Sequence, residues 1–122
     1  MILNTKDLYE KMLNTPDLAG KFELIGETLF WDLFDGFSVE IALTENDTYL
    51  SIASPREELI HWHPFAEDIY EEVCRMGTKG NVTLIRKNFF LVSLLYMGKA
   101  KDCPYPPNKT RAFGKLYRLT AK

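Results

Sequence analysis

The sequence predicts a single α+β domain over residues 1–122, in which a mainly antiparallel sheet of about six to seven strands carries one N-terminal helix and one central amphipathic helix. Three observations predict this class. The chain has 122 residues, 46% hydrophobic and 26% charged, which is typical of one soluble globular domain. Apolar residues alternate with a period of two over most of the chain, as strands do. In two segments the period lengthens to that of a helix.

The first expected element is a short helix close to the N-terminus. Asn4 or Thr5 supplies a side chain that can cap its first turn. Leu8, Met12 and Leu13 then fall on one face, which predicts that this face is buried.

The next segment predicts a run of strands separated by turns. Gly26-Glu27 and Asp35-Gly36 are typical turn pairs, and an acidic turn follows at residues 45–47. The expected strands are 22–25, 28–33, 37–44 and 48–54. Residues 55–64, which begin and end with proline, are expected to form a connector without a strand.

The central helix is predicted to begin at Pro64. Phe65, Ile69 and Val73 recur every four residues and indicate a buried stripe. Gly77 is expected to end the helix in a left-handed conformation. The opposite face carries the four candidate binding carboxylates of an acidic face, namely Glu67, Asp68, Glu71 and Glu72.

Three more strands are expected, at residues 82–87, 89–97 and 111–120. The middle strand is apolar on both faces, which favours the interior of the sheet. A long Pro-rich loop at 98–110 precedes the last strand. A short similarity between Asp7-Leu8-Tyr9-Glu10 and Asp68-Ile69-Tyr70-Glu71 is too brief to indicate a duplication.

Charge is distributed very unevenly along the chain. Residues 1–74 contain 4 basic and 16 acidic residues, whereas residues 75–122 contain 11 basic residues and one acid, Asp102. The net charge of −2 therefore combines −12 and +10. If strands of the two halves alternate in one sheet, the charges cancel locally; if they separate, the molecule has an acidic and a basic end.

The basic half offers a second candidate binding face. Basic and aromatic side chains alternate along the last strand, a pattern that can contact phosphates and stack bases. Alternatively, Phe113, Tyr117 and Leu119 belong to the core, with the basic stems lying over apolar surface. The candidate residues of this basic face are Arg86, Lys87, Arg111, Lys115, Tyr117 and Arg118.

His61-Trp62-His63 contains the only two histidines of the chain. In an extended segment both imidazoles point the same way and can reach one metal ion. No third ligand stands at a recognised spacing, so we interpret the pair as structural, with His63 capping the helix ahead of Pro64, Trp62 packing as an anchor and His61 solvated. No metal, cofactor or catalytic residue is predicted.

These observations favour a small non-enzymatic binding protein that uses a charged surface for protein–protein recognition, as an immunity protein or an inhibitor does. The alternative is a nucleic-acid-binding domain that uses the basic last strand and the Pro-rich loop. A metal-dependent enzyme centred on His61 and His63 is the least favoured interpretation. The longest apolar stretch has nine residues and no signal sequence is evident, so we expect a cytoplasmic protein without a membrane partner. A disulfide between Cys74 and Cys103 has no support in their spacing.

Overall fold

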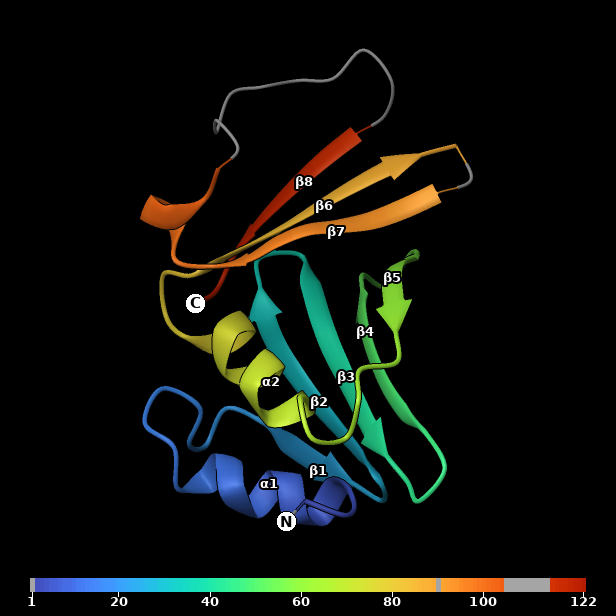
Figure 1. The fold of residues 1–122 in the computed structure, drawn as a ribbon, viewed down its shortest axis with the longest axis vertical. Coiled ribbons are helices and arrows are strands. Elements are labelled where there is room, and N and C mark those ends of the chain that lie inside the picture. The colour runs from blue at the N-terminus through green and yellow to red at the C-terminus, as the bar shows by residue number, and fades with distance from the viewer. Residues whose placement is uncertain (1, 90, 105–114) are drawn as a thin grey trace.

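The computed structural model describes residues 2–89, 91–104 and 115–122 of the chain (Figure 1). Two α-helices, eight strands and one 3₁₀ turn lie in these residues. In chain order they are α1 (Thr5–Leu13), β1 (Glu23–Ile25), β2 (Thr28–Phe34), β3 (Phe37–Leu43), β4 (Thr48–Ala53), β5 (Glu58–Trp62), α2 (Ile69–Gly77), β6 (Val82–Asn88), β7 (Leu91–Gly98), η1 (Ala100–Asp102) and β8 (Lys115–Thr120).

The predicted α+β class and antiparallel pairing are confirmed, but the strands form two sheets rather than one. The first, sheet A, has the order β1-β2-β3-β4-β5, and the second, sheet B, has the order β7-β6-β8. The count of six to seven strands was too low because β5 lies in the segment predicted as a connector. Its adjacent apolar residues Leu59 and Ile60 interrupt the period of two, and its pairing with β4 contains an irregularity between Ile52 and Ala53.

The division of the strands between two sheets decides whether the charges of the acidic and basic halves cancel locally or stay apart. Sheet A and α1 come from the acidic residues 1–74, and sheet B comes from the basic residues 75–122, with α2 connecting them (Figure 1). In the part of the chain that the structure describes, no strand of one half pairs with a strand of the other. The charges are therefore not neutralised across neighbouring strands, and the fold keeps an acidic and a basic end.

The main core lies between the inner face of sheet A and the helices. In Figure 1, α2 crosses this face, and α1 lies across its lower end. Leu8 and Met12 of α1 and Ile69, Val73 and Met76 of α2 are fully or almost fully buried. The Asn4 side chain accepts a hydrogen bond from the backbone N–H of Asp7, which confirms the predicted cap. Leu13, predicted to be buried, is 44% exposed, because it lies about 100° around the helix from the buried Met12.

The central helix begins five residues later than predicted. The carbonyl oxygen of Pro64 accepts a hydrogen bond from the hydroxyl of Thr48, which ties this residue to β4 instead of to a helical turn. Phe65 is consequently 73% exposed and does not belong to the buried stripe. Gly77 is the last helical residue and its φ is not positive, so it is no left-handed cap. Because glycine has no Cβ, the ring of Trp31 can occupy the space that a side chain at this position would need.

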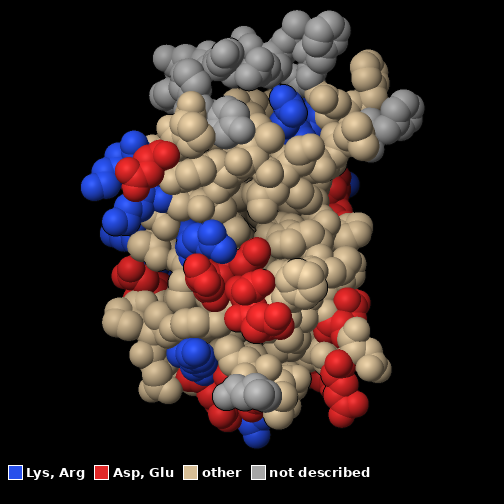
Figure 2. All heavy atoms as spheres, in the orientation of Figure 1, with Lys and Arg blue, Asp and Glu red and all other residues tan. Residues whose placement is uncertain are grey.

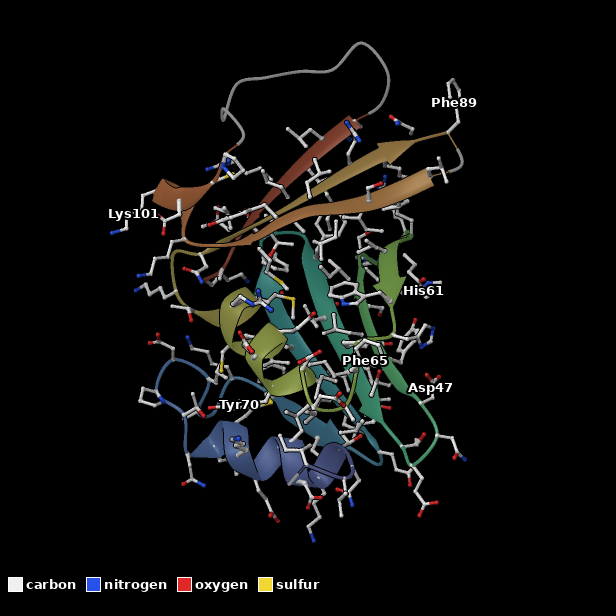
Figure 3. The ribbon with its side chains drawn as sticks, viewed as in Figure 1. Asp47, His61, Phe65, Tyr70, Phe89 and Lys101 are labelled. Atoms are coloured by element: carbon white, nitrogen blue, oxygen red, sulfur yellow. The ribbon has the colours of Figure 1, made fainter. Side chains whose placement is uncertain are left out.

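Strand β7 is an edge strand, although its apolar character favoured the interior of the sheet. Strand β6 takes the central position, and Val82 to Ile85 are buried there. Leu94 and Met97 of β7 pack against the core. The apolar residues at the other end of β7 lie at the exposed tip of the β6–β7 hairpin, where Phe89 is also found (Figure 3).

Candidate functional site: a groove between the two helices

A groove of about 930 Å³ lies between α1 and α2. Apolar side chains and the ring of one tyrosine form part of its lining, and acidic side chains form its rim. The apolar members are Ile2, Leu3, Ala66 and Tyr70, and the carboxylates are Asp7, Glu10, Glu67 and Glu71. Among the described residues that line it, Lys11 is the single cation.

Tyr70 sets the distance between the two walls of the groove. Its hydroxyl shares a hydrogen bond of 2.6 Å with Thr15 Oγ1, which follows α1. Lys11 Nζ lies 4.1 Å from the centroid of the Tyr70 ring, a cation–π arrangement. Figure 3 shows Tyr70 between the two helices. The tyrosine of one helix is thus held by two residues of the other helix and the turn after it.

Thr5 anchors the N-terminal end of α1 to sheet A. Its hydroxyl donates to the carbonyl oxygen of Leu43 at 3.2 Å and accepts from the Leu43 N–H at 2.9 Å. Thr5 is buried, so both bonds are shielded from water. This contact fixes the wall that carries Asp7 and Glu10.

Most of the rim carboxylates face solvent without a counter-charge. Asp7 accepts a hydrogen bond from the Leu3 N–H at 3.0 Å and lies in the first turn of α1, where a negative charge is favourable. Glu10, Glu67 and Glu71 are exposed and form no ion pair within the described residues. Figure 2 shows acidic side chains gathered over α2 in the middle of this face. The groove is therefore a region of negative potential.

The four carboxylates predicted on the central helix have three different positions. Glu67 and Glu71 line the groove. Asp68 precedes α2 at the N-cap position, is exposed, and makes no side-chain capping bond. Glu72 is half-buried and accepts a hydrogen bond of 3.0 Å from Trp62 Nε1, so it connects α2 to the end of β5.

Sequence reasoning missed the contribution of α1 to this groove. Asp7 and Glu10 face Glu67 and Glu71 across it. The one available signal was the similarity between residues 7–10 and 68–71, because both segments supply rim carboxylates. Four residues carry too little information to indicate that two helices lie together.

The predicted basic residues do not form one face. Lys115 and Lys87 are cross-strand partners on the side of sheet B that also carries Tyr117, whereas the alternation of the strands places Arg86 and Arg118 on the other side. Arg111, together with Phe113, lies outside the described residues.

Tyr117 is half-buried and packs against the core, so it is not a fully exposed stacking platform. Its ring meets the Phe37 ring edge-on at 5.9 Å, and Lys115 Nζ lies 4.8 Å from its centroid. Leu119 is buried. The burial of Leu119 agrees with the interpretation that assigned it to the core, whereas Tyr117 is half-buried and packs against that core.

Among the described residues, two lysine–carboxylate ion pairs join the basic half to the acidic half. Lys87 Nζ lies 2.8 Å from Glu57 Oε2, and Lys122 Nζ lies 3.2 Å from Asp32 Oδ2. The hydrogen bond and charge of Lys87 lower the pKa of Glu57, and the same contact raises the pKa of Lys87. Both pairs are solvent-exposed to a large extent, so they reduce the charge separation only where the two sheets meet.

The two histidines lie at the end of β5, beside Tyr49 of β4. His61 Nδ1 contacts Glu58 Oε1, and His63 Nδ1 lies 3.0 Å from Asp47 Oδ1 and 2.6 Å from the carbonyl oxygen of Thr48. His63 therefore bonds to the start of β4 and does not cap the central helix, because that helix begins only at Ile69. Within residues 2–89, 91–104 and 115–122, no group of three or more His, Cys, Asp or Glu side chains is arranged to hold a metal ion.

Neither helix in the described part of the chain is long and apolar enough to cross a membrane. No known protein family, characterised protein or solved structure matches this chain in comparisons of each kind.

Proposed function

We propose that this protein is a small non-enzymatic binding protein that recognises a basic segment of a partner protein in the groove between α1 and α2. The observation that supports the proposal is the composition of the groove. Four carboxylates surround an apolar floor, with one lysine of the chain against them. A partner that brings Lys or Arg side chains together with apolar ones fits both features.

Tyr70 indicates how a basic side chain can bind. The ammonium group of Lys11 already lies over its ring, 4.1 Å from the centroid. A guanidinium or ammonium group of the partner can make the same contact while Glu10, Glu67 or Glu71 neutralises its charge. Leu3, which lines the groove, and Phe65, which directly precedes the lining residue Ala66, are exposed apolar side chains that offer area for the apolar part of the partner.

The separation of charge in the fold supports an electrostatic role for this groove. The basic residues of the second half belong mainly to sheet B and the segments next to it, and not to α1 or to the rim of the groove. The cations that belong to the two helices are Lys6 and Lys11 of α1 and Arg75 of α2, and only Lys11 of these lines the groove, so its four carboxylates outnumber the nearby positive charges. The resulting negative potential increases the association rate of a basic partner at low salt.

A quantitative pull-down from the native host tests the proposal. The bait is the intact chain with the double change Glu67→Gln and Glu71→Gln, compared with the unchanged chain. A matched control carries Glu23→Gln and Asp35→Asn, which remove the same charge from exposed positions outside the groove. A basic protein that is captured by the unchanged chain and the control but lost with the groove variant supports the proposal. Equal capture by all three baits contradicts it.

Nucleic-acid binding is the second candidate, and one observation favours it. Sheet B, η1 and the chain end collect basic side chains at one end of the molecule, partly visible at the upper left of Figure 2. Lys115 and Arg118 lie on opposite faces of β8, so charge reversal at each tests a different face. A retarded band in a low-salt gel-shift assay that is lost with one reversal supports this candidate, and no retardation at low salt excludes it.

A further inference from the structure

Three aromatic side chains gather on the exposed face of sheet A, where β4 begins and β5 ends. The rings of Tyr49, His61 and His63 form a nearly equilateral triangle, with centroid separations of 5.7, 5.9 and 5.9 Å. Each histidine side chain is about half exposed. Figure 3 shows His61 and Asp47 pointing outward, away from α1 and α2. This cluster is separate from the groove.

The partners of the two histidines determine which ring nitrogen carries the proton. Thr48 presents a backbone carbonyl oxygen and Asp47 a carboxylate, and both groups only accept hydrogen bonds. His63 must therefore donate from Nδ1. His61 Nδ1 faces the carboxylate of Glu58 and donates in the same way. In each neutral imidazole the lone pair is then on Nε2.

Tyr49 keeps Glu58 in place for His61. Its hydroxyl donates to Glu58 Oε2 at 3.0 Å, while Glu58 Oε1 accepts from His61.

We propose that His61 and His63 form a site for a divalent transition-metal ion, coordinated by the two Nε2 atoms. Histidines that bind metals commonly donate their other ring N–H to a carboxylate or a backbone carbonyl, and both histidines do so here. Imidazole nitrogen is a suitable ligand for Zn²⁺, Ni²⁺ and Cu²⁺. The carboxylates of Glu58 and Asp47 act on the ion through the histidines, and water fills the remaining positions.

The ring separation fits one shared ion. With metal–nitrogen bonds of about 2.1 Å and a tetrahedral angle, two imidazole centroids lie about 5.2 Å apart. The separation of 5.9 Å between the His61 and His63 centroids is about 0.7 Å longer than this, and the exposure of both rings leaves room for them to turn their Nε2 atoms toward one ion. Because only two protein ligands take part, the ion keeps exchangeable positions that a ligand or a partner group can occupy.

The test uses the intact chain and Ni²⁺, Zn²⁺ and Cu²⁺ salts as probes. Nitrogen-15 NMR of the two imidazoles is expected to show protonated Nδ1 and unprotonated Nε2 before addition. On addition of Zn²⁺, both Nε2 signals are expected to shift while both Nδ1 atoms keep their protons. Calorimetry is expected to give one ion per chain, bound most tightly for Cu²⁺. Nε2 atoms that are protonated in the metal-free protein, or that do not respond to any of the three ions, overturn the proposal.

Substitutions of the two histidines and of their hydrogen-bond partners distinguish coordination by His61 and His63 from binding of the ion elsewhere on the chain. His61→Gln and His63→Gln are each expected to abolish tight binding, and Glu58→Gln and Asp47→Asn to weaken it about 10- to 100-fold. Glu57→Gln is the matched control, because its carboxylate faces Lys87 and not a histidine, and it is expected to change nothing. Binding that persists in the double histidine variant would assign the ion to the thiols of Cys74 or Cys103 and overturn the proposal.

Discussion

The α2 backbone lies close against the Trp31 ring of sheet A at Gly77, and replacing this glycine by alanine gives a sharp test of the packing. A Cβ at this position would lie 1.8 Å from Trp31 Cη2 and 2.7 Å from both Trp31 Cζ3 and Leu18 Cδ2. Carbon atoms pack at about 3.5–4.0 Å, so the indole would have to move by about 2 Å. Trp31 is buried and the Phe22 ring lies only 3.9 Å from it between centroids, which leaves no room for that movement.

The expected cost of Gly77→Ala is large for one methyl group. Overpacking a core costs about 1–3 kcal/mol, and the 1.8 Å approach places this site at the upper end. The better helix propensity of alanine returns at most about 1 kcal/mol. We therefore expect Gly77→Ala to lower the free energy of unfolding by about 2 kcal/mol or more, measured by urea denaturation followed by tryptophan fluorescence.

Two further variants separate steric conflict from other effects. Gly80→Ala is the control, because Gly80 has a φ of +88° and no atom within 4 Å of the added Cβ, so its cost of about 1–2 kcal/mol arises from the backbone alone. Trp31→Phe removes the two ring carbons nearest to the new methyl group. It is expected to rescue Gly77→Ala, with a coupling of about 1 kcal/mol or more, and not Gly80→Ala. A Gly77→Ala variant as stable as the unchanged protein, or equal behaviour of the two glycine variants with Trp31→Phe, would refute the steric argument.

Three further predictions concern single contacts. Thr5→Val is expected to cost about 1–3 kcal/mol in thermal unfolding, because it leaves the buried N–H of Leu43 without its partner. Glu72→Ala is expected to cost about 1–2 kcal/mol through the lost bond to Trp62, whereas Glu71→Ala, on the exposed side of α2, is expected to stay within about 0.5 kcal/mol in the same urea titration. The folded-state pKa of Glu58 lies below its ordinary value of 4.5, so its stabilisation is complete above that pH and is lost as the pH falls through the folded pKa. Glu58→Gln is expected to flatten the acid side of the stability profile, and an unchanged profile would contradict this assignment.

Local sequence patterns predicted strands β1 to β4 of sheet A well. The turns at Gly26-Glu27 and Asp35-Gly36 connect β1 to β2 and β2 to β3, as expected from the conformational freedom of glycine. The predicted cap at Asn4 is observed as well. These features depend on a few neighbouring residues, and such information is present in the sequence.

Features that depend on distant residues could not be predicted in the same way. The helix start at Ile69 instead of Pro64 follows from the hydrogen bond between Thr48 and Pro64, which are 16 residues apart. The role of Gly77 follows from the position of Trp31, which lies on another element. The groove requires α1 and α2 to lie together, and no periodicity within either helix contains that information.

The charge distribution was visible in the sequence, but its meaning depended on topology. Sheet A is an antiparallel meander of consecutive strands, so every strand pairs with a strand of its own acidic half. In sheet B, β6 pairs with both β7 and β8, so every strand of this sheet also pairs with a strand of its own basic half. The remaining attraction is confined to exposed pairs such as Lys87–Glu57 where the halves meet. The basic partner that we propose would therefore be attracted to the groove and repelled from sheet B, and this separation of charge would orient it before contact.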